Sequence, residues 1–213
     1  GEVFAIPNCL IASLSSDGQT VTRVRRVGAH GTDIWRLEAI NGLCRRLCAA
    51  PVPAQDAQAE LERTLAAAPR YKGRTRLLAH FVAAAMFTLF FGGNGCDAMC
   101  AGLCGIAIGL CLWLAERLGA NLFVKTIAAG AVSAVLAAGL VALGLGRSAD
   151  LVTIGALMLL VPGVALTTAV RDIMVGDMVS GLSRLAEAFL IAIAIALGTG
   201  LGLGLAPWMG GGV

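Results

Sequence analysis

The chain has 213 residues, of which 58% are hydrophobic and 14% are charged, and its mean hydropathy is +0.84. Ordinary soluble domains carry roughly 25% charged residues, so this composition excludes a wholly soluble protein and predicts a mainly α-helical membrane protein. The formal net charge is only +3. Arg and Lys lie beside apolar segments, as topology signals do, which argues against nucleic acid as a partner.

A β-hairpin is predicted at the start of the chain. Glu2–Leu14 alternates loosely between apolar and polar residues, Ser15–Gly18 is a turn signal, and Thr20–Val27 is rich in β-branched residues. Two such runs around a short turn are typical of paired strands.

Two helices are predicted to follow the hairpin. Thr32 or Asp33 could cap a helix that runs to about Cys48, because a short polar side chain accepts a hydrogen bond from the first helical turn. A second, shorter helix is predicted over Ala54–Ala67. Residues 1–72 therefore predict a small cytoplasmic α+β domain. A domain of this size buries little apolar surface. We therefore expect that further residues precede it, or that it packs against the membrane part.

Five transmembrane helices are predicted within residues 73–213. Each apolar stretch is long enough for a hydrocarbon core of about 30 Å. Small-xxx-small spacings in Gly102–Gly109 and Gly198–Gly204 permit close helix contact. The five predicted spans are 77–95, 98–116, 122–144, 150–170 and 184–206.

Charges at the ends of these spans predict their orientation. The side with few charges has only Arg147. Positive charge marks the cytoplasmic side, so the N-terminus is predicted to be cytoplasmic and the C-terminus outside. The excess of Arg over Lys, with abundant Ala and Gly, points to a bacterial source and hence to the inner membrane. The charges on the cytoplasmic side are Arg63, Arg70, Lys72, Arg74, Arg76, Arg117, Lys125, Arg171 and Arg184.

The most informative stretch is the polar passage between the fourth and fifth spans. Pro162 and Gly163 should interrupt the fourth span, because proline removes a backbone donor and clashes with the preceding turn. An ionisable residue at membrane depth is costly and marks a functional site, and a broken helix beside it is typical of transporters. The candidate residues of the substrate and proton pathway are Pro162, Gly163, Thr167, Thr168, Arg171, Asp172, Asp177, Arg184 and Glu187.

Two interpretations of these side chains remain open. In the functional one, Glu187 carries the coupling proton, while Asp172 with Arg171 binds substrate or gates the inner mouth. In the local one, Arg184 pairs with Glu187 one helical turn further on. The two threonine hydroxyls would then bond the carbonyls of the preceding turn, as is common in membrane helices.

The seven cysteines are interpreted as packing residues. Cys96, Cys100 and Cys104 share one helix face and Cys111 lies one heptad beyond, but no histidine is near, so no metal site is predicted. No Ser-His-Asp set, HExxH motif or Walker motif is present. The chain is therefore predicted to have no catalytic residues and no cofactor, and to be neither an enzyme nor an ATP-driven pump.

A family resemblance rests on the segment from Pro162 to Ala188, PGVALTTAVRDIMVGDMVSGLSRLAEA. It resembles the signature of the threonine/serine exporter family (ThrE and YjjP-like proteins), and the opening GEVFAIP is similar to that family's N-terminal module. The resemblance implies a proton-coupled secondary exporter of small amino acids or small carboxylates. It also implies an oligomer and a second, YjjB-like membrane module on another chain. Family members commonly carry Asn at the position of Thr168, a departure that bears on the substrate.

We therefore expect a subunit of a bacterial inner-membrane exporter for threonine, serine or a small carboxylate such as succinate. The alternative is a membrane-anchored scaffold or sensor whose cytoplasmic head binds a partner. Five spans with an internal break and embedded charge exceed what an anchor requires. A third hypothesis, an intramembrane hydrolase, has less support because no nucleophile–base pair is evident.

Overall fold

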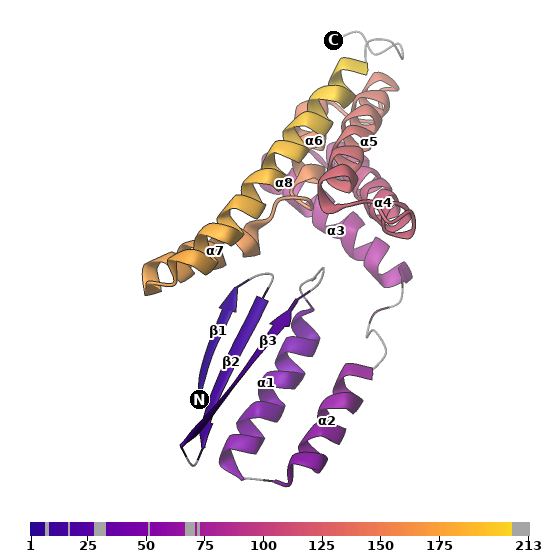
Figure 1. Ribbon diagram of the computed structural model, residues 1–213. Helices are drawn as coiled ribbons and strands as arrows, with labels where there is room; N and C mark the ends of the chain where they lie inside the picture. Colours follow the sequence, from indigo (N-terminus) through magenta and orange to yellow (C-terminus); the bar gives the residue numbers. More distant parts are fainter. Residues whose placement is uncertain are drawn as a thin grey trace. The chain divides into compact units, whose positions relative to one another are not determined.

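The computed structural model describes residues 1–6, 9–16, 18–27, 33–50, 52–66, 71 and 73–205. The chain divides into two compact units (Figure 1). The first comprises Gly1–Phe4 and Asn8–Lys72, and the second comprises Ala5–Pro7 and Gly73–Val213. Most described residues are helical, and the strands lie at the N-terminal end of the chain.

A three-stranded sheet in the order β1-β2-β3 opens the chain. β1 (Glu2–Ile6) and β2 (Cys9–Ser16) replace the single strand predicted over Glu2–Leu14. The residue between them at position 7 is proline, which cannot donate to a sheet ladder, and it lies outside the described residues. β2 pairs antiparallel with β3 (Gln19–Arg26) in the predicted hairpin.

The helices α1 (Ile34–Ala49) and α2 (Ala54–Ala66) follow the sheet. Asp33 caps α1 by accepting a hydrogen bond from the backbone N–H of Arg36 at 3.1 Å, one of the two predicted caps. The two helices pack against each other, and Arg46 of α1 forms an ion pair with Glu60 of α2. The strand β3 is exposed along its whole length.

The second unit is a bundle of six helices in the described part of the chain. They are α3 (Gly73–Phe90), α4 (Gly95–Arg117), α5 (Leu122–Ala142), α6 (Ala149–Leu157), α7 (Gly163–Val175) and α8 (Met178–Leu205). Among the described residues, three of these, α4, α5 and α8, are long and apolar enough to cross a membrane. The prediction of five transmembrane helices is therefore not supported.

Two of the predicted spans account for the difference. The first, 77–95, is α3, an 18-residue helix whose first two turns carry Arg74, Arg76 and His80 and which ends at Phe90. The fourth, 150–170, is two short helices, α6 with 9 residues and α7 with 13. At 1.5 Å per residue these are roughly 14 and 20 Å long, and neither crosses a core of about 30 Å alone.

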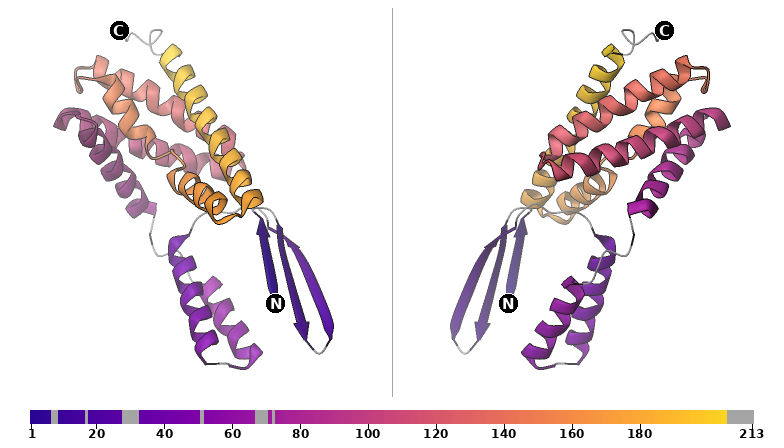
Figure 2. Two further views of the ribbon diagram at one scale, coloured as in Figure 1. Left: turned by 90° about the vertical axis from the view of Figure 1, so that its left-hand side faces the viewer. Right: turned by 90° about the vertical axis from the view of Figure 1, so that its right-hand side faces the viewer.

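Close helix contacts at glycines hold the bundle together (Figure 2). α3 packs along α4, where a Cβ added to Gly105 would lie 2.6 Å from the carbonyl oxygen of His80. α8 packs along α5, where a Cβ on Gly198 would lie 2.3 Å from the carbonyl oxygen of Ile127. Only glycine permits such an approach, as in other membrane helix pairs.

The core of the bundle consists of small side chains from four helices. Cys100 and Cys104 of α4 are 3% and 0% exposed and lie within this core, whereas Cys96 is exposed. Its buried members are Ala84 of α3, Cys100, Ala101, Cys104 and Ile108 of α4, Ala129 and Ala137 of α5, and Val152 and Ala156 of α6.

Candidate functional site

The helix predicted to break at Pro162 and Gly163 does so. α6 ends at Leu157, and the next residues form tight turns in which the N–H of Leu160 donates to the carbonyl of Leu157 at 2.8 Å. α7 begins at Gly163, and Pro162 stands at its N-cap position. The regular helical hydrogen bonding is lost over four residues, from Leu159 to Pro162, which is a wider break than a single proline predicts.

The two halves of this broken helix have different neighbours. α6 packs against α3, α4 and α5, whereas α7 packs against α8. No side-chain hydrogen bond caps α7, because proline occupies the capping position. The first N–H groups of a helix attract anions, so the uncapped and exposed start of this half-helix suits a substrate carboxylate.

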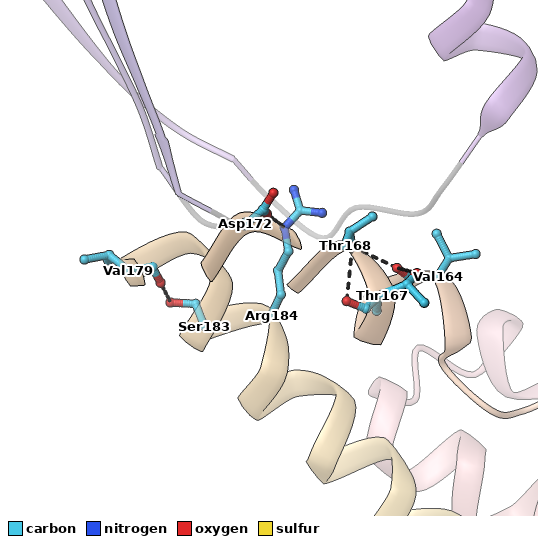
Figure 3. Close-up of polar contacts among 8 residues, drawn as sticks. Val164, Thr167, Thr168, Asp172, Val179, Ser183 and Arg184 are labelled. Carbon is cyan, nitrogen blue, oxygen red and sulfur yellow. Dashed lines mark hydrogen bonds and ion pairs between the residues drawn. The ribbon is translucent and has the colours of Figure 1, made fainter. Parts of the chain in front are cut away.

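The hydroxyls of Thr167 and Thr168 are bonded within α7 (Figure 3). Thr167 Oγ1 donates to the carbonyl of Gly163 at 3.0 Å, and Thr168 Oγ1 donates to the carbonyl of Val164 at 2.8 Å. These bonds to the preceding turn are the ones that the local interpretation predicted for the two threonines. Their hydroxyl protons are already used, which leaves only oxygen lone pairs for a ligand.

A tight corner joins α7 to α8. Gly176 has a left-handed backbone with φ of 97°, and the N–H of Asp177 donates back to the carbonyl of Asp172 at 2.9 Å. This arrangement is a Schellman motif, which needs a left-handed residue that glycine supplies. α8 therefore starts at Met178, six residues before the predicted span 184–206.

The charged residues gather around this corner. Arg184 Nε lies 3.8 Å from Asp172 Oδ2, so the arginine pairs across the corner rather than with Glu187 as the local interpretation proposed (Figure 3). Within the described residues Glu187 has no ion pair or hydrogen bond and is half-buried. Arg171 and Asp177 are exposed.

The length of α8 places these charges relative to a membrane. Its 28 residues make a helix of about 42 Å, roughly 12 Å longer than a hydrocarbon core. If the apolar C-terminal part fills the core, the first two turns of α8 extend beyond it. Arg184 then lies at the boundary, and Glu187 lies just inside.

Among the described residues, three buried hydroxyl oxygens of the bundle have no hydrogen-bond partner, and the sequence did not single them out. They belong to Ser133 on α5, Thr153 on α6 and Thr199 on α8. Two other buried hydroxyls in the same unit donate to the carbonyl four residues earlier, Thr88 to Ala84 at 3.0 Å and Thr126 to Leu122 at 2.8 Å. The first three leave that local bond unmade.

Thr153 lies on α6, the first half of the broken helix, whereas Ser133 and Thr199 lie on the packed helices α5 and α8. Thr199 lies opposite Gly130 of α5, whose added Cβ would be 3.5 Å from Thr199 Oγ1. Ser133 follows Gly130 by one turn, on the buried face of α5. Thr153 is beside the core residue Val152 on α6. An unpaired hydroxyl away from water is unfavourable, so each is a group that a polar ligand would satisfy.

Asp97 is a further buried group that the sequence did not identify. It is 2% exposed and forms a capping box with Asn94 at the start of α4. Its Oδ1 accepts hydrogen bonds from the backbone N–H groups of Arg147 at 2.6 Å and Ser148 at 3.2 Å. The carboxylate therefore ties α4 to the turn between α5 and α6, which is a structural role.

The described residues contain no group of three His, Cys, Asp or Glu side chains that could hold a metal ion. A family model described as "Putative threonine/serine exporter" (ThrE) matches residues 1–206. Neither a curated protein nor a solved structure matches the chain.

Proposed function

Because this chain belongs to the threonine/serine exporter family, we propose that it is the membrane subunit of a secondary exporter for small polar metabolites. Candidate substrates are threonine and serine, or small carboxylates such as succinate. The observation that carries this proposal is the helix broken between α6 and α7, with an uncapped start of α7 at Gly163 and a charged corner at the other end of α7. Interrupted helices of this kind bind substrate in many transporters.

We assign the substrate carboxylate to the first N–H groups of α7, after Pro162. A partial positive charge at a helix start stabilises an anion without a buried cation. The ion pair between Arg184 and Asp172 joins the last turns of α7 to α8, and we propose that it controls access to the substrate. A substrate that competes for Arg184 would loosen this pair, which gives the pair a gating role.

Glu187 is proposed as the proton-coupling residue. It is half-buried on α8 just inside the proposed membrane boundary, and no described side chain compensates its charge. An ionisable residue at membrane depth is costly and marks a functional site. We therefore assign to Glu187 the role of taking a proton on one side of the membrane and releasing it on the other.

The remaining parts of the proposal follow from charge and from the family. Over the five predicted spans nine basic residues lie on one side and one on the other, and on that basis we propose a cytoplasmic N-terminus and an external C-terminus in a bacterial inner membrane. This division of charges requires α3 and the α6–α7 pair to cross the membrane in addition to the three long helices. A second membrane module on another chain and an oligomeric assembly complete the proposed transporter.

Efflux from proteoliposomes tests the proposal. The purified chain is reconstituted alone and with a candidate second module, and efflux of threonine, serine and succinate is measured under an imposed pH gradient. Efflux in either reconstitution supports the exporter. Absence of efflux of every substrate from both reconstitutions would favour a membrane-anchored scaffold or sensor instead.

The variant Glu187→Gln tests the coupling assignment within that assay. It should abolish pH-driven accumulation but retain exchange of substrate for substrate, because exchange needs no net proton movement. Asp172→Asn should weaken both activities and serves as the comparison. Accumulation by Glu187→Gln at the parental rate would remove Glu187 from the coupling mechanism.

A further inference from the structure

Two hollows follow one another along α3. The first has a volume of about 330 Å³ and lies between the start of α3 and the end of α4. The second also has a volume of about 330 Å³ and lies further along α3, where its lining is entirely apolar. The first is lined by Gly73, Arg74, Arg76, Leu77, His80, Gly109, Leu110 and Trp113, the second by Ala83, Met86, Phe87 and Phe90.

Five of the lining residues share one face of α3 and link the two hollows. Arg76, His80, Ala83, Phe87 and Phe90 are spaced four, three, four and three residues apart, and this spacing keeps side chains on one face of a helix. We call the two hollows with this shared face the groove, which is basic at the start of α3 and apolar towards its end.

The basic end of the groove has unused hydrogen-bond donors. Within the described residues, neither Arg74 nor Arg76 has an ion-pair partner. The Nδ1 atom of His80 lies 2.7 Å from the carbonyl oxygen of Arg76, which leaves its Nε2 free for a ligand. Arg117 lies over the ring of Trp113, 4.2 Å from its centroid, and adds positive charge beside the pocket.

The apolar end of the groove has the length of one membrane leaflet. From His80 to Phe90 the helix rises about 15 Å, half of a hydrocarbon core of about 30 Å. Met86 and Phe90 are 58% and 81% exposed, so the chain itself does not cover them. Trp113 at the other end is the residue type that membrane interfaces favour.

We propose that this groove binds an anionic phospholipid. The phosphate lies between Arg74, Arg76 and His80, and an acyl chain lies along Ala83, Phe87 and Phe90. Charge complementarity selects an anionic headgroup, as basic pockets between membrane helices do. The apolar continuation selects a lipid over a free phosphate. This proposal does not depend on the transport activity, because it concerns a different face of the bundle.

Native mass spectrometry of the full chain tests the proposal. The purified protein is titrated with phosphatidylglycerol and, separately, with phosphatidylcholine. Phosphatidylglycerol should bind more tightly, and the double variant Arg74→Gln/Arg76→Gln should bind it roughly 10- to 30-fold more weakly. Arg147→Gln is the matched control, because it removes one exposed arginine of the same unit outside the groove. Equal affinities of the two lipids, or the same loss in the control, would overturn the proposal.

A second arm separates a lipid from its soluble headgroup. Ala83→Trp fills the apolar part of the groove and should weaken phosphatidylglycerol binding while leaving any weak binding of glycerol phosphate unchanged. If glycerol phosphate alone displaces the lipid at similar concentrations, the site recognises free phosphate and the lipid assignment is wrong. A protein dimer that forms in place of the lipid adduct would assign the groove to a second copy of the chain.

Discussion

Removing the unpartnered hydroxyls should stabilise the protein and impair its transport. Thr153→Val replaces a hydroxyl with a methyl group of nearly the same shape, and Ser133→Ala removes one. Neither substitution breaks a hydrogen bond in the structure, because neither oxygen has a partner. Thr126→Val is the matched control. It removes a buried hydroxyl from α5, but that hydroxyl is bonded to the carbonyl of Leu122.

The expected changes in stability depend on whether each hydroxyl forms a hydrogen bond. Burying a hydroxyl without a partner costs about 1–3 kcal/mol in protein mutational data, and Thr153→Val should recover part of that. Thr126→Val should instead lower stability by about 0.5–1 kcal/mol, since it removes a made bond. If Thr153 bonds the substrate, its loss should lower kcat/KM for efflux by roughly two- to tenfold.

Thermal unfolding in detergent and efflux from proteoliposomes measure the two effects on the same preparations. Thr153→Val should raise thermal stability and slow efflux, so the two effects have opposite signs. The control should show lower stability and unchanged efflux. A Thr153→Val variant that is more stable and transports at the parental rate would show that its hydroxyl does not bind substrate. Unchanged stability would show that the hydroxyl has a partner after all.

Three further predictions concern packing and orientation. Gly198→Val should lower stability by about 1–3 kcal/mol because its Cβ would lie 2.3 Å from a carbonyl oxygen of α5, whereas Gly200→Val, with nothing within 4 Å of its Cβ, should change thermal stability little. Asp97→Asn should lower the free energy of unfolding by about 2 kcal/mol, because a charged acceptor of three backbone N–H groups is lost. Denaturation midpoints would test this. A membrane-impermeant thiol reagent added to sealed cells should label Cys96 and not Cys44. Both side chains are exposed in the structure, so only the membrane can separate them, and labelling of Cys44 would reverse the proposed orientation.

The sequence predicted the features that local chemistry determines. The Asp33 cap, the hairpin and the break at Pro162 each depend on a few neighbouring residues, and the structure confirms all three. The family read from the Pro162–Ala188 segment is also confirmed. The count of five spans is not supported, because hydropathy averages over a window. Such an average cannot register that α6 ends at Leu157, before the proline, or that α3 begins with two arginines.

Contacts between residues far apart in the sequence could not be predicted, for a related reason. Asp97 accepts from backbone groups 50 and 51 residues away, and no local spacing indicates such a partner. The unpaired hydroxyls differ from the paired ones only in what surrounds them, since Ser and Thr residues have the same i−4 carbonyl available in any helix. Arg184 likewise had two carboxylates within reach along the chain, and the corner at Gly176 determined that it meets Asp172.

The packing also indicates which part of the bundle is free to move during transport. α6 is fixed by three helices, and the C-terminal half of α8 is fixed to α5 through Gly198 and Gly202. α7 packs against α8 and continues into α6 only through the irregular residues 159–162. Motion of α7 with the first turns of α8 would therefore leave the core cluster intact while it opens or closes the start of α7. The Arg184–Asp172 pair lies within this corner, so α7 and the first turns of α8 can move as one piece with the ion pair intact. Breakage of the pair would therefore accompany substrate entry and not the motion of α7.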